Sequence, residues 1–282
     1  MEAECAAGLF QVLSISFTMS ERINTRNPNE ISKLRKAGEV SARILTEVAA
    51  IVKPGITTKE IDDYARELFA REKCGNAFYG YAGYPGQLCI SVNEVVVHGI
   101  GDSRVVKDGD IVSLDAGAIV DGWYGDNALT VPVGNVSEDA RRLLAVTEEA
   151  LYRGIEQAKQ GNNLADVCGA IEDFVRPFGF GIVRDYVGHG VGRKLHEDPS
   201  IPNYRPHYRL PHLKRGMILA IEPMITLGSW RVKVLEDRWT AVTADGSWAA
   251  HFEHTVAVGS HGGDILTDRP RIALPEQLGI AL

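Results

Sequence analysis

The chain has 282 residues, of which 24% are charged and 45% hydrophobic, a composition typical of globular proteins. Its net charge of -7 argues against a nucleic-acid-binding protein that depends on phosphate contacts. No apolar run approaches the roughly 18 residues that a membrane-spanning helix needs, so we expect no membrane partner. The four cysteines form no CxxC motif, which predicts reduced thiols and a cytoplasmic protein.

Residues 1–26 are expected to form a loosely ordered N-terminal extension, and residues 27–282 a single domain. The extension begins with acidic rather than basic residues, which argues against a secretory signal. Met19 is an alternative translation start, because the polar segment that follows it leads directly into the first predicted helix.

Two helices are predicted at the start of the domain. The first begins at Pro28 with apolar residues along one stripe, and it ends before Pro54. Thr57 and Glu60 have the spacing of a capping box, which predicts the start of the second helix. A loop rich in glycine and tyrosine follows over 75–86.

Strands are predicted next. Residues 89–99 read as two short strands around a turn. In the stretch 111–131, the Asp121-Gly122 turn signal separates two β-prone runs, which predicts a hairpin. This turn places Asp115 and Asp126 on one face as diagonal neighbours. Two carboxylates that close repel by a few kcal/mol at an effective dielectric of about 20, so a positive group is expected between them.

Two more helices open the second part of the chain. Ser137, followed by acidic residues, predicts a third helix that ends near Gly161. Asn163 and Asp166 predict the start of a fourth. Beyond Pro177 the pattern changes to strands and loops, and the second part therefore repeats the order of the first.

The later segments are predicted from composition and alternation. Residues 203–213 have the proline and histidine content of a loop. Residues 217–227 are predicted to be one strand, and residues 238–259 a hairpin that turns near Asp245-Gly246. The tail after residue 264 shows little periodicity.

An internal repeat accompanies this order. Two pairs of segments match at nearly the same spacing: 52–61 with 158–167, and 108–117 with 215–224. The second match superposes Asp115 on Glu222, and Asp126 has its natural counterpart in Glu253. We interpret the repeat as a duplication, with pseudo-repeat halves at about 27–135 and 136–260 and a C-terminal tail at 261–282.

Four carboxylates therefore lie on strands that would otherwise be core: Asp115, Asp126, Glu222 and Glu253. His189 lies between glycines, which allow a close approach. Oxygen ligands with one imidazole suit Mn, Fe, Co or Zn. Two such ions about 3.5–4 Å apart, bridged by two of the carboxylates, can lower the pKa of water from 15.7 towards about 7. The pattern predicts hydrolytic chemistry.

Each candidate has a structural alternative. Glu222 precedes a proline and could be an edge-strand residue, and His189 could be a hydrogen-bonded turn histidine. The glycines of 188–192 could form a phosphate loop, but no helix follows them, which disfavours a nucleotide-binding protein. His251 and His254 beside the last carboxylate suggest a zinc site, but in a strand His254 points away from it.

Five motifs then occur together in order: VNEVVVHGI (92–100), SLDAG with GWYGDNA (113–128), YVGHGVGRKLHEDP (186–199), LAIEPM (219–224) and FEHTVAV (252–258). Through them the chain resembles the bacterial type I methionine aminopeptidases, from about Asn27 to about Gly259. The resemblance implies the α+β pita-bread (creatinase/aminopeptidase) fold, in which two pseudo-symmetric αβ halves surround a curved antiparallel β-sheet.

The resemblance also implies two divalent metal ions and their ligands. Asp115 would bind one ion, His189 and Glu222 would bind the other, and Asp126 and Glu253 would bridge both. The metal could be Co, Mn, Fe or Zn.

By the same resemblance, three residues take part in catalysis. His98 would lie near the scissile peptide and the substrate amine, and His196 would hydrogen-bond the scissile amide or carbonyl. Glu222 would also shuttle the proton. The methionine pocket would draw on Tyr81, Tyr84, Cys89, Leu195 and Trp239.

The implied activity is removal of the initiator methionine from nascent proteins whose second residue is small. The expected partners are N-terminal peptides near the ribosome, and the expected state is a monomer.

Departures from common bacterial residues at Ala82, Val97 and Leu195 affect the pocket and leave the metal residues intact. An X-Pro aminopeptidase or dipeptidase of the same fold is the alternative, although those enzymes usually carry an N-terminal domain. A second alternative is a non-catalytic binding protein on this fold. Such a protein would be expected to have lost metal ligands, whereas this chain keeps all five together with His98 and His196.

Overall fold

A computed structural model describes residues 23–273. The alternative start at Met19 and most of the predicted loose extension lie outside the described residues. Where the extension is described, it contacts the domain. The backbone N–H of Arg26 donates to the carbonyl of Gly216 at 2.7 Å, and its guanidinium pairs with Glu197 at 2.5 Å.

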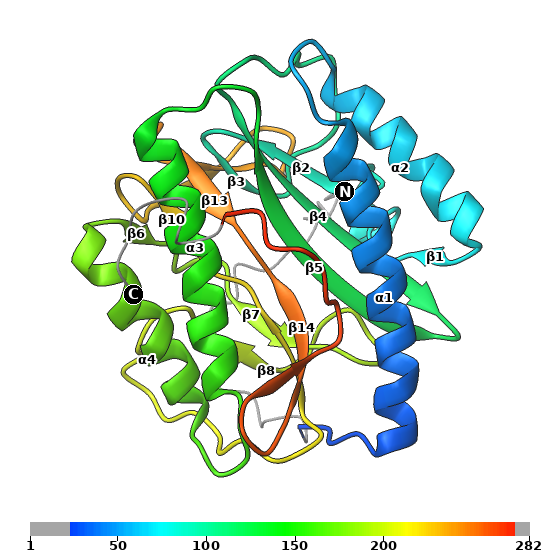
Figure 1. Ribbon diagram of the computed structural model, residues 1–282, viewed down its shortest axis with the longest axis vertical. Coiled ribbons are helices and arrows are strands. Elements are labelled where there is room, and N and C mark those ends of the chain that lie inside the picture. Colours follow the sequence, from blue (N-terminus) through cyan, green and yellow to red (C-terminus); the bar gives the residue numbers. More distant parts are fainter. Residues whose placement is uncertain (1–22, 274–282) are drawn as a thin grey trace, which may run out of the picture.

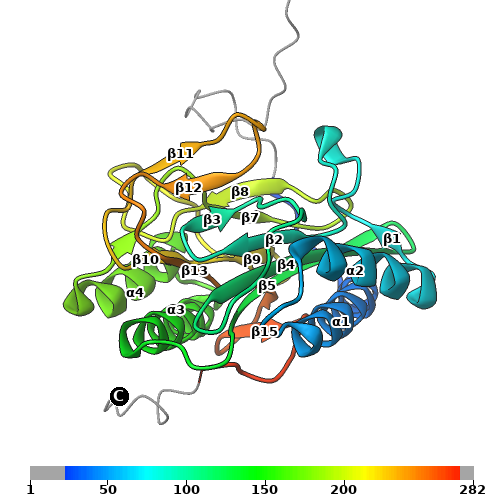
Figure 2. The same ribbon diagram turned by 90° about the horizontal axis from the view of Figure 1, so that it is seen from above.

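Figure 2 shows the helices along one face of the strands; towards the opposite face lie β8 (Glu197–Ile201), β11 (Val232–Val234) and β12 (Ala241–Thr243). Within residues 23–273 the α-helices are α1 (Pro28–Ile51), α2 (Thr58–Glu72), α3 (Glu138–Gln157) and α4 (Leu164–Val175). All were predicted, and α3 ends at Gln157, shortly before Gly161, where the backbone leaves the helical conformation at Ala158 (ψ 59°). Each helix pair is followed by antiparallel strands (Figure 1), which confirms the α+β class.

The predicted caps begin the helices. Thr57 accepts a hydrogen bond from the N–H of Glu60, whose carboxylate in turn accepts from the N–H of Thr57 at 2.8 Å. Asn163 and Asp166 form the equivalent box at α4, and the Ser137 side chain caps α3. These bonds satisfy amides of the first turn that have no partner within the helix, which is why the helix starts could be read from the sequence.

The central hairpin has the predicted register. It consists of β4 (Ile111–Val120) and β5 (Trp123–Pro132). Asp121 and Gly122 both adopt positive φ angles, 52° and 72°, as a two-residue hairpin turn requires. Asp115 faces Ala128, and Asp126 pairs two residues further along β4. The two carboxylates are therefore diagonal neighbours.

The segment 217–227 was predicted as one strand and is instead two, β9 (Ile218–Ile221) and β10 (Met224–Thr226). Pro223 has no backbone N–H and cannot continue the ladder. As a result, β9 pairs with β14 (His254–Val258), and β10 pairs with β13 (Ala249–His251). The break leaves Glu222 at the junction of two sheets.

The hairpin predicted over 238–259 is wrong. Its first strand, β12 (Ala241–Thr243), pairs with β11 (Val232–Val234) and β3 (Val95–Val97), whereas β13 pairs with β10. The turn itself does form, since Gly246 has a φ of 77°. The local turn signal was correct, but strands from distant parts of the chain supply the pairing partners.

The remaining short elements complete the sheets. β1 (Gly75–Asn76) and β2 (Cys89–Val92) pair with β4. The other elements are η1 (Tyr81–Gly83), η2 (Arg176–Phe178), β6 (Gly181–Ile182), β7 (Gly188–Gly190), β8 (Glu197–Ile201) and β15 (Gly263–Ile265). The largest sheet has the order β15-β14-β9-β7-β8.

Backbone and hydroxyl hydrogen bonds join the two halves where β5 meets β14. The Thr255 hydroxyl donates to the carbonyl of Asp126 at 2.7 Å and accepts its N–H at 3.2 Å. The N–H of Glu253 donates to the carbonyl of Ala128 at 2.8 Å. Two carboxylate residues from opposite halves thereby share one hydrogen-bonded network.

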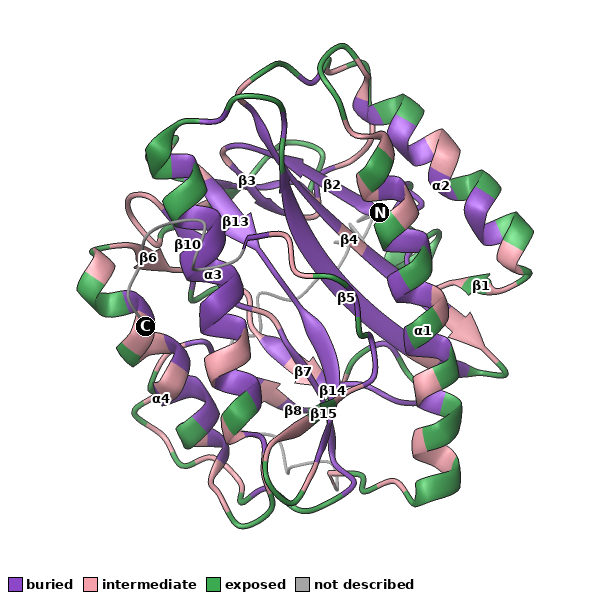
Figure 3. Cartoon of the chain, in the orientation of Figure 1, coloured by how far each residue is buried: buried purple, intermediate pink, exposed green. Residues whose placement is uncertain are grey.

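The core lies between the helices and the strands, where both turn their buried residues towards each other (Figure 3). The most buried large side chains include Leu45, Ile61 and Phe252. Among residues 23–273, none of the helices combines the length and the apolar character that crossing a bilayer requires.

Candidate metal centre

All five predicted metal ligands line one cavity, although they come from four regions of the chain. Asp115 lies on β4 and Asp126 on β5, His189 is the middle residue of β7, Glu222 lies between β9 and β10, and Glu253 directly precedes β14. The hairpin turn, the proline break and the joint between β5 and β14 thus bring the four carboxylates and the imidazole together.

The ligand atoms within this cluster are close enough to one another to bind one cation together. His189 Nε2 lies 3.8 Å from Asp126 Oδ2 and 3.6 Å from Glu222 Oε1. Asp126, His189 and Glu253 each offer one ligand atom, and these atoms all lie within 4.8 Å of one another. A divalent ion that binds nitrogen and oxygen at about 2.0–2.2 Å would fit between such atoms after small side-chain adjustments.

Several carboxylate oxygens of the cluster have no hydrogen-bond partner. One buried oxygen each of Asp115, Asp126 and Glu253 is unsatisfied. Burying an ionised carboxylate without a partner is costly, so buried carboxylates are normally paired or bound to metal. The donor set and its unsatisfied oxygens therefore fit a divalent metal.

Burial also changes the protonation of these acids. It raises the pKa of Asp126 to about 7. Burial, and then repulsion from neighbouring carboxylates, raises the pKa of Asp115, Glu222 and Glu253 well above the usual range. These carboxylates therefore bind protons in the metal-free protein, and a divalent ion would displace those protons when it binds.

His189 is oriented to present a lone pair to this cluster. Its Nδ1 donates to the carbonyl of Gly190 at 2.9 Å, so in the neutral ring Nε2 is the unprotonated nitrogen. Burial lowers the pKa of His189 to about 3, and its contacts with Asp126 and Glu222 are therefore not ion pairs. A neutral imidazole with a fixed tautomer is suited to bind a metal.

The other two predicted histidines lie in the same cavity. The rings of His189 and His196 have centroids 4.3 Å apart, and the Tyr81 hydroxyl is hydrogen-bonded to His196 Nδ1 at 2.9 Å. His98 packs edge-on against Tyr186 at 5.3 Å. Burial lowers the pKa of both His98 and His196 to about 4, so both rings are neutral at physiological pH.

The cavity has an apolar wall beside the carboxylates, formed by Phe78, Tyr84, Cys89 and Leu195. Tyr84 is fixed by a hydrogen bond from its hydroxyl to the carbonyl of Gly99 at 2.7 Å. The cavity volume is about 60 Å³, enough for a few water molecules. All of the predicted pocket residues line it except Trp239, which packs edge-on against Tyr84 at 5.1 Å.

Two residues near the site were not assigned to it from the sequence. Phe78 lines the cavity, and only its position in the loop over 75–86 pointed to it. His251 was considered only for a zinc site, yet its Nε2 lies 3.4 Å from Glu222 Oε2. His254, as predicted, points elsewhere and contacts Tyr152 of α3 at 3.3 Å.

The chain is similar to known proteins in both sequence and structure. Residues 32–260 match the profile of metallopeptidase family M24. Methionine aminopeptidase 1 of Bacillus subtilis is 51% identical over 242 residues, which cover 86% of this chain and 98% of the relative. The methionine aminopeptidase of Clostridium perfringens is 49% identical, with 86% and 97% covered.

Solved structures confirm the pita-bread fold expected from the sequence. The methionine aminopeptidase of Thermotoga maritima superposes with a TM-score of 0.85 at 48% identity, covering 88% of this chain and 100% of that one. An X-Pro aminopeptidase of the same species gives a TM-score of 0.70 at 24% identity, covering 88% and 63%. This second likeness shows the fold alone.

Proposed function

The chain belongs to metallopeptidase family M24, and we propose that it is a methionine aminopeptidase that removes the N-terminal methionine from nascent proteins. One observation carries the proposal: two buried and two partly buried carboxylates and a neutral imidazole surround a site that suits divalent metal, directly beside an apolar wall of the same cavity. The identity of 51% to an enzyme named methionine aminopeptidase, over 98% of its length, supports the substrate class.

We propose that the cluster holds two ions. Asp115 would bind one ion, His189 and Glu222 the other, and Asp126 and Glu253 both. When bound, divalent metal supplies Lewis-acid chemistry, which lowers the pKa of a water molecule and polarises a carbonyl. Co, Mn, Fe and Zn all suit this oxygen-rich donor set with one imidazole.

The two remaining histidines have positions suited to binding the substrate. His98 would contact the scissile peptide and the substrate amine, and His196 would donate to the scissile carbonyl or amide as negative charge develops there. The hydrogen bond to Tyr81 orients the His196 ring. Glu222 is the carboxylate proposed to accept the proton of water and pass it to the leaving amine, a role that its place in the cavity, 3.6 Å from His189 Nε2, supports.

The apolar wall suits a methionine side chain. Tyr84, Cys89 and Leu195, with Tyr81 and Trp239 beside them, would surround the thioether, and sulfur contacts with rings add about 0.3–1.5 kcal/mol each. No cationic or anionic group belongs to this wall among residues 23–273, so a charged first residue would be excluded. A small second residue is expected because the scissile bond must lie against the carboxylates.

We further propose a single catalytic domain over 27–282, with halves at about 27–135 and 136–260 and a tail at 261–282. The protein would act as a cytoplasmic monomer on nascent chains near the ribosome. The net charge of -7 and the absence of a basic block agree with a peptide substrate rather than direct binding of nucleic acid.

One assay tests the activity. Metal-free protein is reloaded with single metals and given Met-Ala-Ser, Met-Lys and Ala-Pro peptides. We expect cleavage of Met-Ala-Ser with Co, Mn or Fe, and almost none of Met-Lys. Preferential cleavage of Ala-Pro would favour the X-Pro alternative, and no cleavage with any metal would favour a binding protein.

A further inference from the structure

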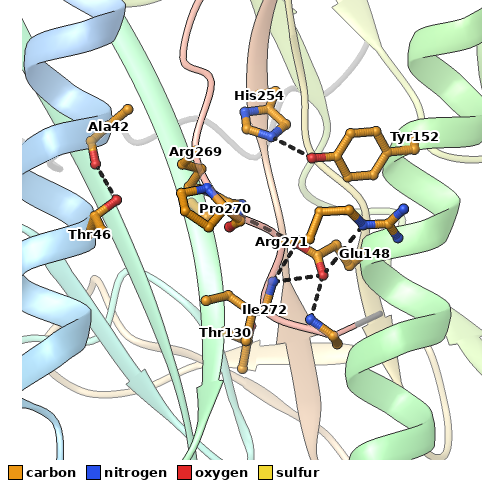
Figure 4. A network of polar contacts seen from close by, with 12 residues as sticks. Ala42, Thr46, Thr130, Glu148, Tyr152, His254, Arg269, Pro270, Arg271 and Ile272 are labelled. Atoms are coloured by element: carbon orange, nitrogen blue, oxygen red, sulfur yellow. Dashed lines mark hydrogen bonds and ion pairs between the residues drawn. The ribbon is translucent and has the colours of Figure 1, made fainter. Parts of the chain in front are cut away.

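A buried arginine lies behind the metal centre, on the helix side of the strands. The Arg269 side chain is 1% exposed. Its Nη2 donates to the carbonyl of Ala128 on β5 at 2.7 Å. Figure 4 shows Arg269 between the strands and α3, beside Pro270 and Glu148. Arg269 does not line the cavity. Its positive charge opposes the rise in the pKa of Glu253, but the proposed reaction gives the guanidinium no step.

The carbonyl of Ala128 occupies a particular place in the site. Ala128 is the direct cross-strand partner of Asp115, and it follows Asp126 by two residues. Its carbonyl also accepts the N–H of Glu253 at 2.8 Å. The Ala128 carbonyl thus lies next to the backbone of three proposed ligands. It accepts hydrogen bonds from two donors, the N–H of Glu253 and the guanidinium of Arg269.

Arg269 is itself held by a carboxylate on α3. Glu148 is fully buried and lies 3.4 Å from Arg269 Nη1. Its oxygens also accept the backbone N–H groups of Ile272, at 3.1 Å, and Ala273, at 2.6 Å. The segment 266–273, here called the C-terminal strap, therefore wraps around Glu148 (Figure 4).

The strap is also attached to β14 beside Glu253. The Thr267 hydroxyl accepts the N–H of Thr255 at 3.1 Å and is bonded to His254 Nδ1 at 3.0 Å. The N–H of Leu266 donates to the carbonyl of Thr255 at 2.9 Å. The strap thus holds β14 on one side and, through Arg269, β5 on the other.

We propose that Arg269 is a positioning residue of the metal centre. It fixes the carbonyl of Ala128 and thereby the spacing between the backbones of Asp126 and Glu253, which together would bridge the ions. Groups that orient metal ligands from behind typically contribute 10–100-fold to metal affinity. The inference rests on the proposed metal site, and it makes the strap a part of that site although the strap touches no substrate.

The test compares two arginines of the same strap. Arg271 pairs with Glu149 at 2.9 Å and lies 3.9 Å from Glu148, whereas Arg269 is the arginine that donates to Ala128. Arg271→Met is therefore the matched control for Arg269→Met. Metal-free full-length proteins are titrated with Mn²⁺ by calorimetry, and their melting temperatures are recorded. We expect Arg269→Met to weaken Mn²⁺ binding by about 10–100-fold and Arg271→Met to leave it within about twofold of the original protein.

The outcomes separate the proposal from a purely structural role. A folded Arg269→Met protein with unchanged Mn²⁺ affinity would overturn the inference, even if its melting temperature fell. If that variant does not fold, Arg269→Lys is the deciding variant. One ammonium group cannot bind both Ala128 and Glu148 as the planar guanidinium does, so we expect several-fold weaker Mn²⁺ binding. Unchanged Mn²⁺ affinity would again overturn the inference. An original protein that binds no Mn²⁺ would instead contradict the proposed metal site itself.

Discussion

Two clusters of buried acids lie on opposite sides of the same strands, and they are satisfied in different ways. On the helix side, Glu148 accepts hydrogen bonds from two backbone amides and pairs with Arg269. On the cavity side, Asp126 and Glu253 each keep a buried oxygen without a partner. The Glu148 carboxylate finds its partners within the folded chain, although among residues 23–273 the Nε of Arg269 has none, whereas carboxylate oxygens on the cavity side remain unsatisfied.

The contrast shows which buried carboxylates to assign to function. A fully satisfied buried acid can hold elements together, as Glu148 holds the strap to α3. A group of unsatisfied acids raises the free energy of the folded chain, and that cost is recovered only when something binds. We therefore propose the cavity cluster as the functional one, although Glu148 is the more deeply buried.

The largest expected effect is the opposite response of the two clusters to loss of charge. Asp126→Asn and Glu253→Gln should abolish metal binding at both positions and with it turnover, because each removes a proposed bridge. Each should also raise the melting temperature of the metal-free protein, since repulsion among buried acids is relieved. Peptide hydrolysis, metal analysis and calorimetric melting check this.

Asp115→Asn is the internal control for that experiment. Asp115 is proposed to bind one ion only, so its loss should mainly weaken one position. If all three variants lose the same number of metal ions, the bridging assignment of Asp126 and Glu253 is incorrect.

The helix-side cluster should respond in the other direction. Glu148→Gln leaves Arg269 without its buried counter-charge, and removing one partner of a buried pair typically costs about 3–5 kcal/mol. We expect a lower melting temperature and a lower midpoint of urea unfolding. A variant as stable as the original protein would remove the distinction drawn between the two clusters.

The cavity histidines should divide into two groups. His98→Ala and His196→Ala should keep the metal but lose turnover by about 10²–10³, if each supplies one hydrogen bond to the transition state. His189→Ala should lose metal affinity instead. Metal content and kcat measured on the same preparations decide this. An empty site in His196→Ala would mean that His196 is a ligand.

The smallest expected effect is the pH dependence of metal binding. Because the pKa of Asp126 is raised to about 7, protons compete with metal for this carboxylate below pH 7. Mn²⁺ affinity should therefore fall as pH decreases, by up to about tenfold per unit for each proton displaced. His189, with its pKa lowered to about 3, does not compete in this range. Calorimetry between pH 6 and 8 should show proton release, and pH-independent affinity would argue that the carboxylates are already ionised.

The sequence by itself determined the parts of this protein that depend on near neighbours. The capping boxes at Thr57 and Asn163 begin their helices within one turn, and the Asp121-Gly122 turn sets which residues face each other in the hairpin. Such signals act over a few residues, so they can be read before the fold is known. The motifs around Asp115 and His189 added the family resemblance and the expected ligands.

The tertiary structure decided what depends on partners far away in the chain. The strand over 217–227 divides at Pro223, and β12 and β13 pair with strands other than each other, because pairing follows the packing of whole sheets. The contact of His251 with Glu222 and the bond from Arg269 to Ala128 join residues that no local pattern relates. These long-range contacts determine which buried acids are satisfied and which remain available for metal.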